Sequence, residues 1–148
     1  MKTGQIRMVL PLLLILGCQD AVENEAVPER SGNSNNFAAE NMIINRQDTI
    51  ENLERFELFL KNGEDDNEDV IRIITYTTEG DPVYRDLLYQ NGKYISSHDS
   101  TRDSYGSGNK SKMECDDLII SENQERIDYV LEDCDSKSQD SNVLTIWK

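Results

Sequence analysis

Three cysteines are the residues of this chain whose surroundings indicate chemistry most directly. Cys18 ends the tetrapeptide Ile15–Cys18, which follows a positive start at Lys2 and Arg7 and an apolar run from Met8 to Leu16. That run of nine residues is too short to cross a bilayer, which needs about 20, but it fits the apolar region of a signal peptide. Residues 1–17 are therefore predicted to be a signal peptide.

The tetrapeptide Ile-Leu-Gly-Cys resembles the lipobox of bacterial lipoproteins. That resemblance implies that Cys18 receives a diacylglyceryl group and becomes the new N-terminus. Two acyl chains hold a protein stably to a membrane, whereas one chain does so only marginally. We therefore expect a lipid anchor on the extracellular face of the cell membrane. The alternative is an ordinary secretory signal followed by a cysteine that occurs there by chance.

The other two thiols are predicted to form a disulfide. Once Cys18 carries lipid, Cys115 and Cys134 remain as an even pair in an oxidising compartment. If Gln124–Glu125 are the central residues of a hairpin turn, counting outward puts Cys115 opposite Cys134. The alternatives are two free thiols or a zinc site, and zinc lacks ligands because His98 is the single histidine.

The same register predicts a strongly acidic hairpin. It places Asp116 opposite Asp133 and Asp117 opposite Glu132, and residues 114–135 hold nine acids and one base. Like charges that face each other across a ladder are destabilising. One hypothesis is that these four side chains bind a divalent cation or a basic partner, such as another envelope protein. The alternative is a solvated sheet end that repels aggregation.

The sequence gives little support for a catalytic site. The stretch 97–100 (Ser-His-Asp-Ser) holds the residue types of a hydrolase triad, but neighbours on a strand point to opposite faces. The one cluster for an enzyme is Asp99, Arg102 and Asp103 together with His98. The chain lacks a nucleophile elbow, a phosphate-binding glycine loop and a metalloprotease helix. We predict no catalytic residue, no cofactor and no metal ligand set.

Charge excludes one class of partner. The chain has 148 residues with 15 Lys and Arg against 29 Asp and Glu, a formal charge of −14, and loss of Lys2 and Arg7 makes it −16. Such a field repels phosphate backbones, so nucleic-acid binding is not expected. Residues 18–41 are acidic and poor in large apolar side chains, which predicts a disordered tether. Residues 42–148 are then one domain.

One helix is predicted from about Thr49 to Asn62. Asp48 begins a capping-box pattern, Asn52 competes as the N-cap, and Gly63 suits the position after the helix. Apolar residues recur at spacings of three and four along one stripe: Ile50, Leu53, Phe56, Phe59 and Leu60. Such a stripe usually packs on a sheet.

The rest of the domain is predicted to form six strands, at residues 70–77, 82–90, 94–98, 112–121, 126–134 and 142–147. Asn91-Gly92 is a type I′ hairpin signal. One face of the cysteine-bearing hairpin is expected to face the core: Leu118, Ile120, Ile127, Tyr129 and Leu131. Trp147 is expected to help close the core. The fold class is α+β, with one amphipathic helix packed on a five- or six-stranded, mainly antiparallel sheet.

Two segments carry a family resemblance: residues 73–82 (IITYTTEGDP) and 99–106 (DSTRDSYG). With the order helix, hairpin, Cys, Cys, they resemble small lipoproteins of Bacillus-like bacteria, domain of unknown function 4362. The resemblance covers roughly residues 50–134 and implies a Gram-positive cell-surface lipoprotein. Its motif positions here are Glu79, Gly80, Asp81, Pro82, Asp99, Arg102, Asp103 and Gly106. It carries over no catalytic residue, and a structural role is favoured over a ligand role for both segments.

These observations favour a lipid-anchored, non-enzymatic envelope protein whose domain binds or modulates another surface component. Two other classes stay open. One is a small envelope enzyme that uses the region of Asp99, Arg102, Asp103 and His98. The other is an inhibitor or immunity-like lipoprotein that uses its acidity to meet a basic partner.

Overall fold

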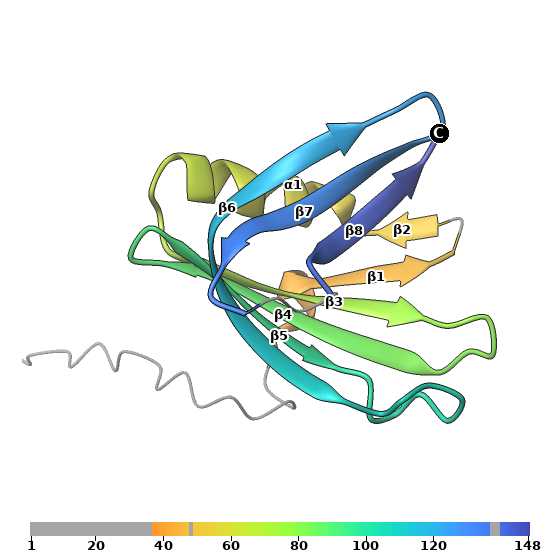
Figure 1. Ribbon diagram of the computed structural model, residues 1–148. Helices are drawn as coiled ribbons and strands as arrows, with labels where there is room; N and C mark the ends of the chain where they lie inside the picture. The colour runs from red at the N-terminus through yellow and green to blue at the C-terminus, as the bar shows by residue number, and fades with distance from the viewer. Residues whose placement is uncertain (1–36, 48, 137–139) are drawn as a thin grey trace, which may run out of the picture. The chain divides into compact units, whose positions relative to one another are not determined.

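A curled sheet and one helix make up the part of the chain that the computed structural model describes, residues 37–47, 49–136 and 140–148 (Figure 1). In chain order the elements are η1 (Ala39–Asn41), β1 (Met42–Arg46), β2 (Thr49–Glu51), α1 (Leu53–Glu64), β3 (Asp69–Tyr76), β4 (Pro82–Gln90), β5 (Lys93–Asp99), β6 (Lys110–Glu122), β7 (Arg126–Cys134) and β8 (Asn142–Trp147). The strand order is β2-β1-β3-β4-β5-β6-β7-β8. Among these residues no helix is long and apolar enough to cross a membrane.

The α+β class with one helix and a mainly antiparallel sheet is confirmed, but the sheet has eight strands rather than five or six. The two strands that the sequence did not predict are β1 and β2. β1 is five residues long and pairs in parallel with β3, so its partner lies on the far side of α1 in the chain. Local periodicity carries no signal for such a pairing.

The helix is shifted along the chain from its predicted position. Residues Thr49–Glu51 pair with β1 as a strand, and α1 begins after Asn52, whose φ is 61° and whose Nδ2 donates to the Met42 carbonyl at 2.9 Å. Gly63 lies inside the helix rather than after it. A Cβ on Gly63 would lie 2.5 Å from the Tyr94 hydroxyl, so close packing explains this glycine better than capping does.

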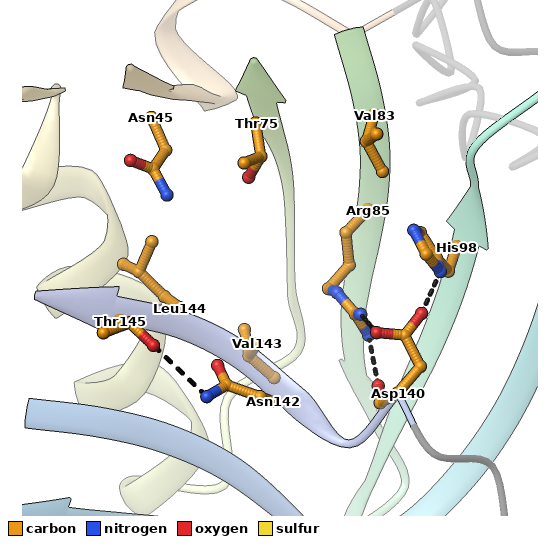
Figure 2. A pocket seen from close by; sticks show the side chains of 10 residues that line it. All are labelled: Asn45, Thr75, Val83, Arg85, His98, Asp140, Asn142, Val143, Leu144 and Thr145. Carbon is orange, nitrogen blue, oxygen red and sulfur yellow. Dashed lines mark hydrogen bonds and ion pairs between the residues drawn. The ribbon is translucent and has the colours of Figure 1, made fainter. Parts of the chain in front are cut away.

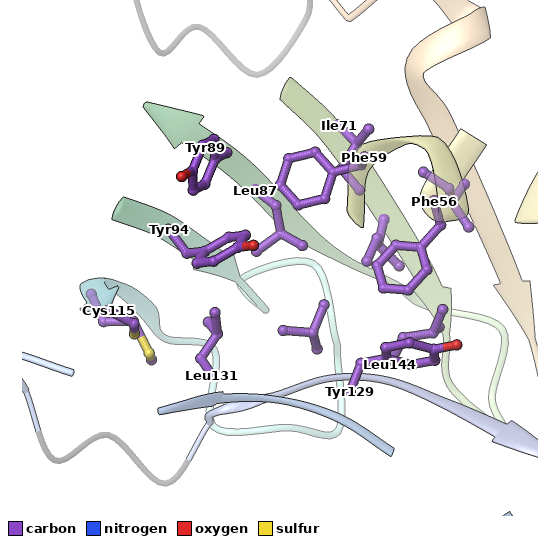
Figure 3. Packing of buried hydrophobic residues seen from close by; sticks show 14 residues of the cluster. Phe56, Phe59, Ile71, Leu87, Tyr89, Tyr94, Cys115, Tyr129, Leu131 and Leu144 are labelled. Carbon is purple, nitrogen blue, oxygen red and sulfur yellow. The ribbon is translucent and has the colours of Figure 1, made fainter. Parts of the chain in front are cut away.

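The helix packs its predicted apolar stripe on the concave face of the sheet (Figure 3). Phe56 and Phe59 are fully buried, and their rings lie edge-on to Tyr129 at 4.8 Å and Tyr94 at 6.2 Å. Leu58 lies off the stripe and is 48% exposed. Because one ring contacts β7 and the other β5, the helix joins both arms of the curl.

Two apolar side chains expected in the core are exposed. Trp147 is 57% exposed because Ile146 takes the inward position next to it, and its ring instead lies 5.4 Å from the Arg126 guanidinium. Ile120 is 59% exposed near the β6–β7 turn, which extends past α1 in Figure 1. Core burial therefore ends before the tips of β6 and β8 do.

Both predicted hairpin registers are confirmed. Asn91 and Gly92 have φ of 54° and 71°, and the strands that they join pair from Gln90 with Lys93. β6 and β7 pair with Cys115 opposite Cys134, and the two cysteines form a disulfide. The bridge closes a loop whose ends are 19 residues apart, and constraining the unfolded chain over such a loop stabilises a protein by about 3 kcal/mol.

A bidentate ion pair joins the helix to the sheet. The Arg55 guanidinium donates to Asp69 at 2.9 and 2.5 Å, and Asn62 donates to the same carboxylate at 2.8 Å. Burial raises the pKa of Asp69, but the hydrogen bonds from Arg55, Asn62 and the Val70 amide outweigh it and hold the pKa below its usual value. The ionised form of Asp69 is therefore favoured by folding.

This pKa shift predicts acid sensitivity. The unfolded chain takes up a proton on Asp69 near its ordinary pKa of 3.8, and the folded chain does so only at lower pH. Stability from the pair is thus fully present above that value and is lost as the pH falls further. Urea unfolding between about pH 5 and pH 2 should show a shallower pH dependence for Asp69→Asn than for the wild type. Glu57→Gln, on the exposed face of α1, should keep the wild-type slope; an unchanged slope in Asp69→Asn would contradict the prediction.

Candidate functional site

A pocket of about 290 Å³ lies between the concave face of the sheet and strand β8 (Figure 2). Its walls come from β1, β3, β4 and β5 on one side and from β8 and Asp140, two residues before β8, on the other. The lining residues are Asn45, Thr75, Val83, Arg85, His98, Asp140, Asn142, Val143, Leu144 and Thr145. The pocket therefore occupies the part of the curl that the helix does not fill.

The concave face changes from apolar to polar along neighbouring strands. On β1 and β3 the buried Ile43 and Ile73 are followed on the same face by Asn45 and Thr75, which pair directly in the sheet. On β4 the buried Leu87 gives way in the same manner to Arg85. Since side chains alternate along a strand, these polar groups share the face that carries the core. Arg85 is opposite Ile73, one inward-facing position closer to the core than Thr75, which is opposite Val83.

Arg85 is the centre of the polar network. It is only 7% exposed; its Nη1 donates to Ser96 Oγ at 2.9 Å and to the Asp140 carbonyl at 3.0 Å, and its Nη2 donates to Asp140 Oδ1 at 2.6 Å. Burial lowers the pKa of Arg85 to about 10, so the guanidinium stays charged at neutral pH. Asp140 lies two residues before β8, so these bonds hold the start of β8 across the curl from β4.

His98 lies directly beside Arg85 on the next strand. Its Nδ1 lies against Asp140 Oδ2, a contact that is an ion pair only when the imidazole is protonated (Figure 2). Burial and the positive charge of Arg85 lower the pKa of His98, and together they outweigh the opposite effect of Asp99. Asp140 thus balances the charge of Arg85 beside a neutral imidazole, and the three groups leave this part of the pocket close to neutral.

Asn45 lines the pocket and has one side-chain group without a hydrogen-bond partner among the described residues. Its Oδ1 is buried and accepts no hydrogen bond from the residues that the structure describes. A buried acceptor without a donor costs about 1–3 kcal/mol. A donor group on a bound molecule would recover part of that cost.

The four residues proposed for an enzyme do not converge. His98 lines the pocket, but Asp99 follows it on the strand and points to the other face, where it accepts hydrogen bonds from Thr101 Oγ1 at 2.6 Å and from the Thr101 amide and pairs with Lys110. The hydrogen bond from Thr101, with help from Lys110, lowers the pKa of Asp99 to about 2. This carboxylate serves the loop after β5 and is not a partner of the imidazole.

Arg102 and Asp103 also serve that loop. Arg102 donates to the Tyr84 hydroxyl at 2.8 Å and lies 4.9 Å from the Tyr84 ring. Asp103 Oδ1 accepts hydrogen bonds from two amides of its own loop. Asp81, from the turn after β3, accepts a hydrogen bond from the Ser104 amide at 2.8 Å, so the two motif segments contact each other.

The remaining motif positions have backbone roles. Gly80 has a φ of 91°, which side chains rarely allow, and its amide donates to the carbonyl three residues earlier. Pro82 begins β4, and Glu79 is exposed in the turn. A Cβ on Gly106 would lie 2.3 Å from Asp103 Oδ2, which explains the glycine there. These contacts are those of a structural pair of loops at the pocket end of the sheet.

The acidic hairpin differs from its predicted pairing at one position. Asp117 is opposite Glu132 as expected, but Asp133 has a φ of 50° and does not pair with Asp116, which instead forms an ion pair with Lys93. The left-handed backbone at Asp133 thus coincides with the one gap in the ladder between Cys115 and Glu122. Within the described ranges no three His, Cys, Asp or Glu side chains gather as a metal site would require. Cys18, the predicted lipidation site, lies outside those ranges.

Sequence reasoning missed most of the pocket. Arg85 carries the one signal that was readable, because it occupies a position of the same parity as Val83 and Leu87 in an otherwise apolar strand face. A charge at such a position indicates a buried ion pair. Its partner Asp140 is 55 residues away, and nothing local in the sequence connects the two.

Removing Asp140 should lower the unfolding free energy more than removing Arg85 does. Asp140→Ala leaves the buried Arg85 charge without its carboxylate and should cost about 3–5 kcal/mol of unfolding free energy. Arg85→Met leaves a carboxylate whose side chain is 34% exposed and fills the space with apolar atoms, so it should cost roughly 1–2 kcal/mol. Urea unfolding at neutral pH measures both, with Arg102→Met as a surface control. Equal stability of Asp140→Ala and the wild type would refute the role of the pair.

Comparison with known proteins identifies the family and nothing finer. No curated protein and no solved structure shows significant similarity to the chain. The profile of a family described as a domain of unknown function, DUF4362, matches residues 40–130. The match runs from η1 into β7 and includes both motif segments and the residues that β1, β3, β4 and β5 contribute to the pocket. This protein belongs to the DUF4362 family.

Proposed function

We propose that this protein is a lipid-anchored protein of the cell envelope whose domain binds a ligand in the pocket between β8 and the concave face, without catalysing a reaction. The observation that carries the proposal is the pocket itself. It combines a rigid, charge-balanced network around Arg85 with an unused buried acceptor on Asn45. Concave sites with a few convergent polar groups are the usual places for ligands.

Binding is favoured over catalysis by what surrounds His98. The imidazole and Asp140 together resemble the base and orienting acid of a hydrolase, but within the described ranges no hydroxyl or thiol is hydrogen-bonded to the ring. The carboxylate is also engaged by Arg85, which uses it to hold β8 in place. The network therefore maintains the shape of the pocket.

Anchoring through Cys18 is the part of the proposal that rests on the sequence. The lipobox-like tetrapeptide at the end of an apolar run supports it, and so does the disulfide, which is typical of proteins outside the reducing cytosol. Membership of the family is consistent with an unknown biochemical role. The anchor would hold the domain that contains the pocket at the extracellular face of the cell membrane.

Labelling can test the anchor. Cells that express the full chain with azide-tagged palmitate should incorporate label in the wild type and not in Cys18→Ala, because diacylation requires the thiol. The wild type should also partition into the detergent-rich phase and the variant into the aqueous phase. The double variant Cys115→Ala/Cys134→Ala is the control and should keep the label. Equal labelling of Cys18→Ala would exclude lipidation at this residue.

Filling the pocket can test ligand binding. Val83→Phe places a ring in the pocket, and Leu88→Phe makes a similar change on the opposite face of the same strand. Fractions of a detergent-solubilised envelope extract that raise the unfolding temperature of the wild type by several degrees should also stabilise Leu88→Phe but not Val83→Phe. The proposal fails if no fraction stabilises the wild type, or if Val83→Phe is stabilised equally.

A further inference from the structure

Strand β8 forms one edge of the sheet and borders the pocket with four consecutive residues, 142–145. Its pairing with β7 determines which backbone groups point away from the sheet. The Lys148 amide donates to the Glu125 carbonyl, and Ile146 is opposite Ile127. Because backbone groups alternate in an antiparallel ladder, Thr145 directs its N–H and C=O away from β7.

Trp147 does the same two residues further along β8. Its backbone N–H and C=O also point away from β7, whereas its exposed ring lies 5.4 Å from the guanidinium of Arg126, its partner residue on β7. Tryptophan and arginine are the side chains most enriched among residues that dominate binding energy at interfaces. The outer edge of β8 therefore presents the backbone groups of Thr145 and Trp147, and the exposed Trp147 ring lies against the neighbouring strand β7.

The two edges of the sheet are protected differently. β2 is three residues long, and its Glu51 forms an ion pair with Arg46 on the neighbouring strand, as expected for an edge that avoids new partners. β8 has six residues, and Asn142–Trp147 contain no charged residue and no proline. An uncharged edge of this length is a template for another strand.

We propose that the ligand of this domain is an extended peptide segment of a partner protein, which adds to the edge of β8 at Thr145 and Trp147 and inserts side chains into the pocket. The inference rests on the proposed function and names its ligand. Peptides that extend a sheet gain affinity from main-chain hydrogen bonds and specificity from pockets for alternate side chains. The Asn45 amide lines the pocket across from β8 (Figure 2) and offers a polar group to such a side chain.

The size of the pocket suits this occupant. Strand rise, strand spacing and sheet spacing together give about 160 Å³ for one residue in a sheet. A pocket of about 290 Å³ therefore has room for side chains that a strand on the edge of β8 would direct into it. That space is small for a complete ligand but adequate for the part of a peptide that crosses the curl.

Charge specifies the partner further. Around Arg85 the pocket is charge-balanced, whereas the chain as a whole has a formal charge of −14. The segment in the pocket should therefore be uncharged, and Lys or Arg residues should flank it. Attraction between such residues and the acidic domain would be screened by salt, so binding should weaken as the ionic strength rises.

Selection from a display library of short random peptides can test the inference, with the full chain in detergent micelles as bait. Selected peptides are synthesised and their affinities measured by fluorescence anisotropy at low and high salt. Thr145→Pro removes the outward N–H without breaking the ladder to β7, and it should weaken binding about tenfold or more. Thr145→Val keeps the N–H while losing the same hydroxyl, and should bind as the wild type does. If Thr145→Pro does not fold, Trp147→Pro compared with Trp147→Leu provides the same test.

The outcomes distinguish a failure of strand addition from a failure of the proposed function. Loss of binding in Thr145→Pro and in Val83→Phe supports both. Loss in Val83→Phe alone overturns the strand addition and leaves a pocket ligand, and loss in neither overturns both. Failure to select any peptide overturns the peptide ligand, while the envelope-fraction experiment still tests the pocket. A wild-type dimer that Thr145→Pro makes monomeric would also overturn it, because the occupant of the edge would then be a second copy of the chain.

Discussion

The buried guanidinium of Arg85 is the constraint on which the arrangement of this domain depends. It takes its compensating charge from Asp140, at the start of the last strand, and so ties β8 to the opposite wall of the curl. A charge buried to this extent is tolerated only with its partner in place. The ion pair therefore links the correct closure of the sheet to the formation of the pocket.

The helix and the ion pair divide the concave face between them. Phe56 and Phe59 fill one part and join β5 to β7 through their rings. The other part is lined by Asn45, Thr75 and Arg85, which follow the buried Ile43, Ile73 and Leu87 on the same face of their strands. Polar groups in this part need hydrogen-bond partners, and a molecule bound in the pocket can supply them.

Local signals predicted the hairpins well and the sheet edges poorly. Asn91–Gly92 and the spacing of Cys115 and Cys134 determine registers within a few residues of the chain, and both are found in the structure. β1 was missed because its partner β3 lies beyond α1 in the chain. The burial of Trp147 was predicted wrongly, because Ile146 is the residue that faces inward there and the core ends before the tip of β8 does.

The sequence by itself determined the fold class, the order of six strands, the disulfide and the strong negative charge, because each depends on composition or on contacts between near neighbours. Only the tertiary structure decided where the functional surface lies. Arg85 and Asp140 are 55 residues apart, and the edge of β8 meets the pocket only once the sheet has curled. Local patterns specify which residues can pair, but long-range closure specifies which polar groups meet, since their partners are set by the geometry of the whole sheet.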